Sequence, residues 1–219
     1  MSTPQKYRRI FDLMFKAYGP QHWWPGDSPF EIMVGAVLTQ NTSWSNVEKA
    51  VVHLKGNGAL DPQAIIDTHH KRLASWLRPV GYFNVKAKRL KSFCQWYLEA
   101  GQFNRLARLD TDELRKALLS VNGVGPETAD DILLYAFERP VFVIDAYTRR
   151  LFSRLGYIGG DEGYEALRVS FEKKLQKQPD LVQLFNEYHS LIVWHAKYFC
   201  KTRPVCEGCC LRKHCTLVS

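Results

Sequence analysis

The chain has 219 residues, 46% of them hydrophobic, and a formal net charge of +8. This length allows one large domain or two small ones, and this hydrophobic share excludes a disordered chain. The basic balance suits a polyanionic partner, either a nucleic acid or an acidic membrane surface, but a basic surface without such a partner would give the same net charge. The N-terminus lacks an apolar signal core, and no apolar run approaches the length of a membrane span, so we expect an intracellular protein with no membrane partner.

Helical periodicity dominates the chain, and the first helix is predicted around residues 7–18. A second helix starts at Ser28, which can act as the N-cap, with Pro29 in the first turn and Glu31 completing a capping box. The run VFVI at 141–144 is the best strand candidate, and we interpret it as a helix start or a buried extended connector. Further helices are predicted at 43–56, 70–78, 84–100, 111–121, 126–138, 145–155, 161–177 and 180–199. The predicted fold class is therefore all-α.

A basic stretch runs from Lys71 to Lys91 without an acidic residue, and Trp76, Tyr82 and Phe83 lie within it. Basic side chains bind phosphates, and aromatic rings can stack on bases or wedge between them. A solvated helix face with a few core aromatics would give the same pattern. With the net charge of the chain, the stretch favours nucleic acid as the partner.

A glycine turn joins two predicted helices in VNGVGPETADD, residues 121–131. Gly123 and Gly125 can adopt positive φ and leave their backbone N–H groups uncovered, and Pro126 suits the first turn of the next helix. Such a hairpin can bind an anion, which in DNA is a backbone phosphate. An ordinary helical hairpin remains an equal alternative on this motif alone.

Asp145 follows the apolar run VFVI at a predicted helix start. Burial and the positive end of the helix would shift the pKa of its carboxyl in opposite directions. An aspartate at the edge of a cleft can activate water or stabilise a developing cation. In isolation, the residue would be interpreted as a helix N-cap.

The C-terminal tail concentrates cysteines in the pattern C-x5-C-x2-C-x5-C, formed by Cys200, Cys206, Cys209 and Cys215. Four thiolates in so short a loop can bind zinc or an iron–sulfur cluster, and the wide outer spacings favour the cluster. Cys210 could replace Cys209 as the third ligand.

The hairpin, the aspartate and the cysteine loop, in this order, resemble the helix-hairpin-helix DNA glycosylases, and the endonuclease III group in particular, over about residues 28–215. The resemblance implies a central helical domain at 28–138 and a second domain made of 1–27 and 139–219. The second domain would carry a 4Fe-4S loop at 200–215.

The resemblance also implies roles for single residues. Asp145 matches the catalytic aspartate, Gln40 in VLTQNT matches the residue that fills the gap left by an extruded base, and Tyr82 in VGYFN matches the wedge. The expected DNA-binding residues are Gln40, Tyr82, Lys86, Lys88, Asn122, Gly123, Val124 and Gly125. The expected partner is double-stranded DNA with a damaged base, bound by a monomer.

Two departures from the family pattern stand out. Bifunctional members carry a lysine in G-V-G-x-K-T-A, where this chain has Glu127, and a carboxylate cannot form a Schiff base. The first cysteine spacing is x5 instead of the usual x6. Loss of the lysine predicts a monofunctional enzyme without β-lyase activity.

Glu127 and the pair of tryptophans in QHWWPGD resemble the branch that excises 3-methyladenine. Alkylated purines are cationic, and electron-rich rings hold them by stacking and cation–π attraction. Trp23, Trp24 and Trp44 are the candidate pocket walls, although Trp23 and Trp24 could instead be inter-domain core. The expected reaction is hydrolysis of the N-glycosidic bond of an extruded alkylated base.

Three alternatives stay open at this point. A bifunctional endonuclease III-type enzyme for oxidised pyrimidines would need another amine in the substrate pocket, for which Lys197 is the candidate. A mismatch or uracil glycosylase would share the fold. A metal-stabilised DNA-binding protein without enzymatic activity would use Asp145 only as a cap.

Overall fold

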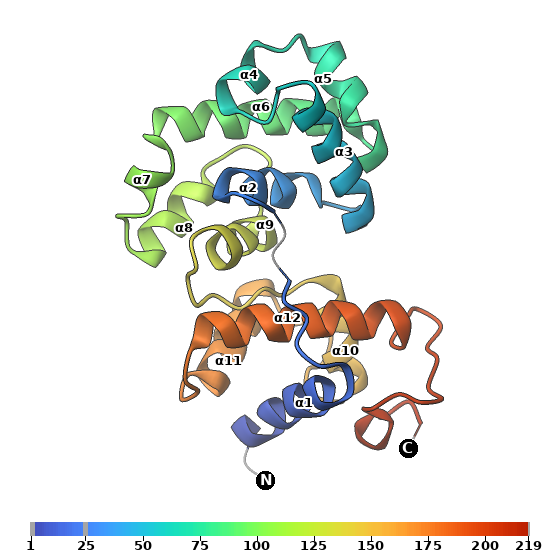
Figure 1. Cartoon of the computed structure of the whole chain (residues 1–219). Helices are drawn as coiled ribbons and strands as arrows, with labels where there is room; N and C mark the ends of the chain where they lie inside the picture. Colours follow the sequence, from blue (N-terminus) through green and yellow to red (C-terminus); the bar gives the residue numbers. More distant parts are fainter. Residues whose placement is uncertain (1–2, 24–25, 219) are drawn as a thin grey trace. The chain divides into compact units, whose positions relative to one another are not determined.

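The computed structural model describes residues 3–23 and 26–218. Contacts divide the chain into two compact units (Figure 1): unit 1 consists of residues 1–23 and 140–219, and unit 2 of residues 24–139. All regular secondary structure in the described residues is helical, which confirms the all-α prediction. None of the helices in these residues is both long and apolar enough to cross a membrane.

Unit 2 is built around α2 (Pro29–Leu38), in which every residue from Glu31 to Leu38 is buried. Its helix α6 (Phe83–Glu99) is the longest of the unit, and α4 and α5 pack along it (Figure 1). The other elements are α3 (Trp44–Gly56), α4 (Pro62–Asp67), α5 (His70–Trp76), η1 (Arg78–Val80), α7 (Gln102–Leu106), α8 (Thr111–Leu119), α9 (Pro126–Asp131) and η2 (Ile132–Ala136). Because α2 contacts α3, α6, α9 and η2, a single apolar helix organises the unit.

Unit 1 has an aromatic core between α1 (Thr3–Tyr18), α10 (Ala146–Arg154), α11 (Tyr164–Leu175) and α12 (Leu181–Tyr198). The ring of Tyr7 stacks on Phe152 with centroids 5.2 Å apart and meets Phe171 edge-on at 4.9 Å. The Tyr188 hydroxyl donates a 2.8 Å hydrogen bond to the Tyr7 carbonyl. These contacts hold α12 against α1 and α10, and the short helix η3 (Arg212–His214) follows in the C-terminal loop.

The predicted helices at 43–56, 70–78, 84–100, 111–121, 145–155 and 180–199 correspond to α3, α5, α6, α8, α10 and α12. The helix predicted at 126–138 changes character, because α9 ends at Asp131 and the π-helical turn η2 follows. The short helices α4 and α7 were not predicted. Residues 141–144 form a buried connector without regular structure, as one of the two interpretations anticipated.

The predicted start of α2 forms as a side-chain cap. The Ser28 hydroxyl accepts the Glu31 N–H at 3.2 Å. The Glu31 carboxylate, however, pairs with the Lys55 ammonium at 2.8 Å and thereby ties α2 to α3. The expected capping box is thus replaced by a cap and a tertiary ion pair.

A buried ion pair fixes the hairpin between α8 and α9. The Asp130 side chain is fully buried, and its two carboxylate oxygens accept from Arg115 Nε at 2.6 Å and from Arg115 Nη2 at 3.1 Å. A bidentate pair of this kind restricts both distance and orientation. The turn at residues 120–125 is therefore held at its base.

Replacing Arg115 by methionine should destabilise unit 2 by about 3–5 kcal/mol, because it leaves the Asp130 carboxylate buried without its cation. Urea unfolding followed by circular dichroism measures the loss. Arg108→Met, at an exposed arginine of the same unit, is the matched control and should change stability by less than about 0.5 kcal/mol. If the Arg115→Met and Arg108→Met midpoints coincide, the ion pair is not what fixes the hairpin.

Candidate functional site

Asp145 stands where the buried connector ends and α10 begins. Its Oδ1 accepts the backbone N–H of Thr148 at 2.6 Å, so the carboxylate caps the helix. The residue is 9% exposed, and the connector that leads to it is buried between Val141 and Ile144. The carboxylate is thus placed by backbone geometry rather than by a free rotamer.

His189 on α12 reaches the same carboxylate, with Nε2 3.5 Å from Asp145 Oδ2. On its other side, the imidazole lies beside Trp23, with ring centroids 5.9 Å apart. Sequence reasoning missed His189, because one histidine within an apolar helix has no spacing that distinguishes it from core. The structure brings Asp145, His189 and Trp23 together in unit 1.

The pKa of Asp145 is set by opposing effects. Burial raises the pKa of the carboxyl, whereas the nearby His189 imidazole and the Thr148 N–H lower it, and the net result is a pKa below the usual value. The side chain is therefore ionised at neutral pH. It can stabilise a cation or accept a proton from water, but it cannot act as a proton donor.

The glycine turn is shaped by one residue in the left-handed region. Gly123 has φ +90°, and a Cβ there would approach Arg89 Cγ to 2.5 Å. Gly125 has φ −95° and ψ 177°, so the expectation that it could supply a second positive φ was wrong. Within the described residues neither glycine N–H donates to a backbone carbonyl, and Asn122 beside them is exposed. The turn thus offers N–H groups to an external acceptor, while the Val124 side chain is buried.

Gln40 joins the segment after α2 to this turn. Its Nε2 donates to the Gly123 carbonyl at 2.8 Å and to Thr128 Oγ1 at 3.1 Å. Its Oε1 accepts from the Arg89 guanidinium. Gln40, predicted to fill the gap left by an extruded base, is therefore hydrogen-bonded to the hairpin that is predicted to bind phosphate.

Tyr82 is the most exposed large hydrophobic residue at the start of α6. Its side chain is 74% exposed, and its φ of +43° is rare for a residue with a side chain. Val85, one turn later, is also exposed, and so is Lys88. An exposed ring held on a strained backbone is suited to a wedge.

Lys86, expected at the DNA surface, is instead 2% exposed. Its ammonium donates to the carbonyls of Leu38 at 2.9 Å and of Val80 at 2.8 Å. Burial, together with the charge of Arg89, lowers the pKa of Lys86 to about 8. The DNA contact predicted for Lys86 was wrong, because the helical period turns this position inward while Lys88 faces solvent.

The remaining pocket candidates are dispersed. Trp44 packs its ring over Gly35 of α2, where a Cβ would come within 2.9 Å of it. Trp24 lies outside the described residues. Glu127 is exposed in the first turn of α9, and Lys197 is exposed on α12. Lys197 follows His189 by eight residues, which is ~12 Å along a helix, so it is not beside the Asp145 carboxylate.

All four predicted cysteine ligands line one small cavity, together with Leu151, Arg154, His195 and Phe199. Cys210 does not line it, and its thiol donates to the Tyr18 hydroxyl at 3.2 Å. The described residues contain no group of three potential ligands placed for a single metal ion. Arg150 and Arg154 attach the loop to α10 by donating to the Cys200 and Lys201 carbonyls at 2.8 Å and 2.6 Å.

Substituting His189 by leucine should raise the pKa of Asp145, because burial then acts against fewer stabilising contacts. His189→Gln keeps a donor and should raise it less. A ¹³C NMR titration of the carboxyl carbons, assigned with Asp145→Asn, measures the shift. An unchanged pKa in His189→Leu contradicts the assigned contact.

The same shift has a consequence for stability. The folded-state pKa of Asp145 lies below the unfolded value of ~3.9, so its stabilising contribution is complete above that value. The contribution is lost as the pH falls through the lower folded-state pKa. His189→Leu should move this acid loss toward higher pH.

Comparison with known proteins places these features in a family. Residues 34–177 match the model of the HhH-GPD superfamily base excision DNA repair protein. The Methanocaldococcus jannaschii protein MJ1434, whose name assigns it provisionally to the DNA repair glycosylases, is 44% identical over 94% of both chains.

Two solved structures share the fold over nearly the whole chain. The Helicobacter pylori 3-methyladenine DNA glycosylase bound to 1,N6-ethenoadenine is 32% identical, with a TM-score of 0.75 over 90% of this chain and 98% of that one. A non-covalent endonuclease III–DNA complex is 25% identical, with a TM-score of 0.81 over 99% and 96%. On these grounds, the chain belongs to the HhH-GPD superfamily of base excision DNA glycosylases.

Proposed function

We propose that the protein is a monofunctional DNA glycosylase that hydrolyses the N-glycosidic bond of alkylated, 3-methyladenine-type bases. The observation that carries this proposal is the Asp145 carboxylate, which is buried, accepts the Thr148 N–H as the cap of α10 and has a lowered pKa. A fixed negative charge of this kind opposes the positive charge that develops on the sugar. The carboxylate also orients the water that attacks C1′.

The leaving group explains why no strong general acid is needed. An alkylated purine already carries positive charge, so the bond to the sugar breaks without prior protonation. Trp23, packed beside His189, is the candidate ring for stacking on such a base. The resemblance to the Helicobacter pylori enzyme, solved with a modified adenine, supports this choice of substrate.

We expect no lyase step, because neither candidate position offers an amine that could attack C1′. The family's lysine position is occupied by Glu127, whose carboxylate cannot attack C1′ to form an imine. Lys197 is exposed on α12, ~12 Å along the helix from His189. Neither residue supplies the nucleophile that a bifunctional endonuclease III-type reaction requires.

DNA is held by backbone contacts and opened by a wedge. The N–H groups of Gly123 and Gly125 receive a phosphate, whereas the Val124 N–H already donates to the Val121 carbonyl, and Lys88 adds a cation on α6. Tyr82 inserts where the damaged base leaves the stack, and Gln40 occupies the remaining space. Extruding the base costs a few kcal/mol of lost stacking and pairing. This cost is lower for a damaged base pair.

A 4Fe-4S cluster fits the cysteine loop better than zinc does. Cys200, Cys206, Cys209 and Cys215 line one cavity, as ligands of a group larger than one ion would. When bound, such a cluster would supply folding energy to a loop that buries little apolar surface of its own. The Arg150 and Arg154 contacts would then transmit that order to α10, which Asp145 caps.

Methylated duplex DNA is the substrate that tests the proposal. We expect release of free 3-methyladenine, with strand breaks only after alkali. Asp145→Asn should lower the rate by a factor of about 10²–10⁴, because the fixed charge is lost. Base release is measured by chromatography and strand breaks on a denaturing gel.

Other outcomes of the same assay distinguish the alternative functions. Strand breaks before alkali, or a covalent complex trapped by borohydride, would falsify the monofunctional assignment. Release only from oxidised-pyrimidine or mismatched duplexes would move the enzyme to another branch. If Asp145→Asn releases bases as fast as the wild type, Asp145 is only a helix cap.

A further inference from the structure

Tyr18, His195 and Cys210 lie next to the cysteine cavity, but none of them has a place in the proposed reaction. Tyr18 ends α1, His195 lies in the last turns of α12, and Cys210 follows the third predicted ligand. His195 is 1% exposed. A buried imidazole needs defined hydrogen-bond partners, so the contacts among these residues have to be accounted for.

The contacts form a chain with one direction. The Cys210 thiol donates to the Tyr18 hydroxyl at 3.2 Å. The Tyr18 hydroxyl lies 2.7 Å from His195 Nδ1, and if it donates to that nitrogen while accepting from Cys210, each of the three groups has a partner. An imidazole that accepts at Nδ1 carries its proton on Nε2. His195 Nε2 is 3.8 Å from Cys209 Sγ, within hydrogen-bond range for sulfur.

Packing holds the rings of this chain in place. The Tyr18 ring lies against Trp194 with centroids 4.1 Å apart, and the His195 ring stacks on Phe199 at 5.7 Å. The donor order therefore does not depend on an exposed rotamer. It ends on Cys209, the one predicted ligand whose identity the sequence left open.

We infer that Tyr18, His195 and Cys210 are positioning residues that direct the His195 Nε2–H to the Cys209 sulfur and so raise the reduction potential of the bound cluster. The inference rests on the 4Fe-4S cluster of the proposed function. A hydrogen bond to a ligating sulfur withdraws negative charge and favours the reduced state. It also makes Cys210 a hydrogen-bond donor rather than a ligand.

The test measures iron content first and then the midpoint potential by voltammetry. We expect Cys209→Ser to lose iron and Cys210→Ala to retain it. His195→Leu removes the donor and should lower the equilibrium constant of reduction about tenfold, which is ~59 mV for one electron. His195→Gln, whose amide N–H can occupy the place of Nε2–H, should restore most of the potential, and Tyr18→Phe should give an intermediate loss.

Tyr198→Phe is the matched control, because it removes an exposed hydroxyl on the same helix and should leave the potential unchanged. Full iron with an unchanged potential in His195→Leu and Tyr18→Phe overturns the inference, as does loss of iron in Cys210→Ala. If His195→Leu fails to fold, the inference is tested by comparing the midpoint potentials of Tyr18→Phe and Tyr198→Phe. Colourless wild-type protein that contains zinc would overturn the cluster itself, while base release tests the glycosylase separately.

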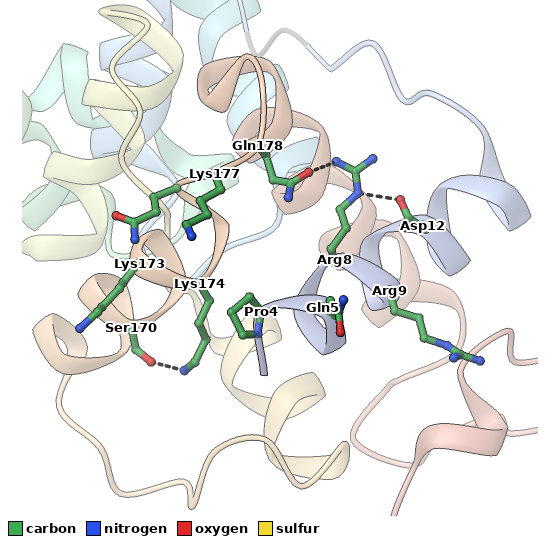
Figure 2. A pocket seen from close by; sticks show the side chains of 11 residues that line it. Pro4, Gln5, Arg8, Arg9, Asp12, Ser170, Lys173, Lys174, Lys177 and Gln178 are labelled. Carbon is green, nitrogen blue, oxygen red and sulfur yellow. Dashed lines mark hydrogen bonds and ion pairs between the residues drawn. The ribbon is translucent and has the colours of Figure 1, made fainter. Parts of the chain in front are cut away.

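A second feature, independent of the cysteine loop, is a hollow between α1 and α11 in unit 1 (Figure 2). Arg8 and Arg9 line it from α1, and Lys173, Lys174 and Lys177 line it from α11 and the turn that follows. Among the described lining residues the one carboxylate, Asp12, accepts from Arg8 Nε at 2.8 Å. The hollow therefore carries an excess of positive charge.

Internal contacts order part of this lining and leave the rest accessible. Arg8 Nη1 donates to Gln178 Oε1 at 2.9 Å, and the Lys174 ammonium lies 4.6 Å from the centre of the Tyr7 ring (Figure 2 shows the Arg8 and Lys174 side chains). Lys173 and Lys177 are exposed, and neither forms an ion pair within the described residues. Two cations are thus available to an external anion.

We propose that this hollow binds the phosphate backbone of duplex DNA, as a contact additional to those of the hairpin. Among the described residues no aromatic or large aliphatic side chain lines it, so this lining lacks both the rings that stack single-stranded bases and the anchors of a protein interface. Phosphate contacts need only cations and polar groups, which the lining supplies. The proposal rests on the DNA-binding part of the proposed function.

Lys173→Gln/Lys177→Gln tests it through the salt dependence of binding to undamaged duplex. Each lost phosphate contact reduces the slope of log K against log salt by roughly 0.9, so we expect a slope smaller by about 2. Lys16→Gln, at an exposed lysine of α1 outside the hollow, should leave the slope unchanged. An equal slope in the double variant and the wild type overturns this contact, whereas a wild type without salt-dependent binding would overturn DNA binding as a whole.

Discussion

A carboxylate taken out of water is stable only where hydrogen bonds and charge replace its hydration, and Asp145 meets this condition through two elements. The Thr148 N–H belongs to its own helix, and His189 belongs to α12. The packing of α10 on α12 therefore sets the position of the charge that the proposed reaction needs. The aromatic core around Tyr7 and Phe152 supports that packing.

The features that sequence reasoning placed correctly are those with a local cause. Ser28 caps α2 because its hydroxyl is three residues from the N–H that it accepts, and Asp145 caps α10 in the same way. The apolar run before Asp145 is buried without regular structure, as one of its two interpretations required. Periodicity was enough for the long helices, because a helix that buries one face repeats its apolar residues at a fixed interval.

The features that sequence reasoning missed depend on contacts with residues distant in the chain. Nothing next to His189 or Lys86 in the sequence indicates that one contacts Asp145 and the other donates to two carbonyls. Both Gly123 and Gly125 could take positive φ, but only Gly123 does, and Arg89 of α6 packs where a Cβ on Gly123 would lie. The contact that distinguishes Cys210 from Cys209 is likewise with Tyr18, which lies near the other end of the chain.

Lys86 was predicted to contact DNA but is buried, and it connects two segments that are proposed to contact DNA. Its ammonium bonds to the Leu38 carbonyl, two residues before Gln40, and to the Val80 carbonyl, two residues before Tyr82. One buried cation thus joins the two segments that are proposed to replace an extruded base. Arg89, one turn further along α6, extends the same connection by donating to Gln40, whose amide donates to the hairpin. Tyr82, Gln40 and the hairpin, which are proposed to contact DNA, are therefore linked through α6 before any DNA is bound, so that little ordering would be left for the binding step.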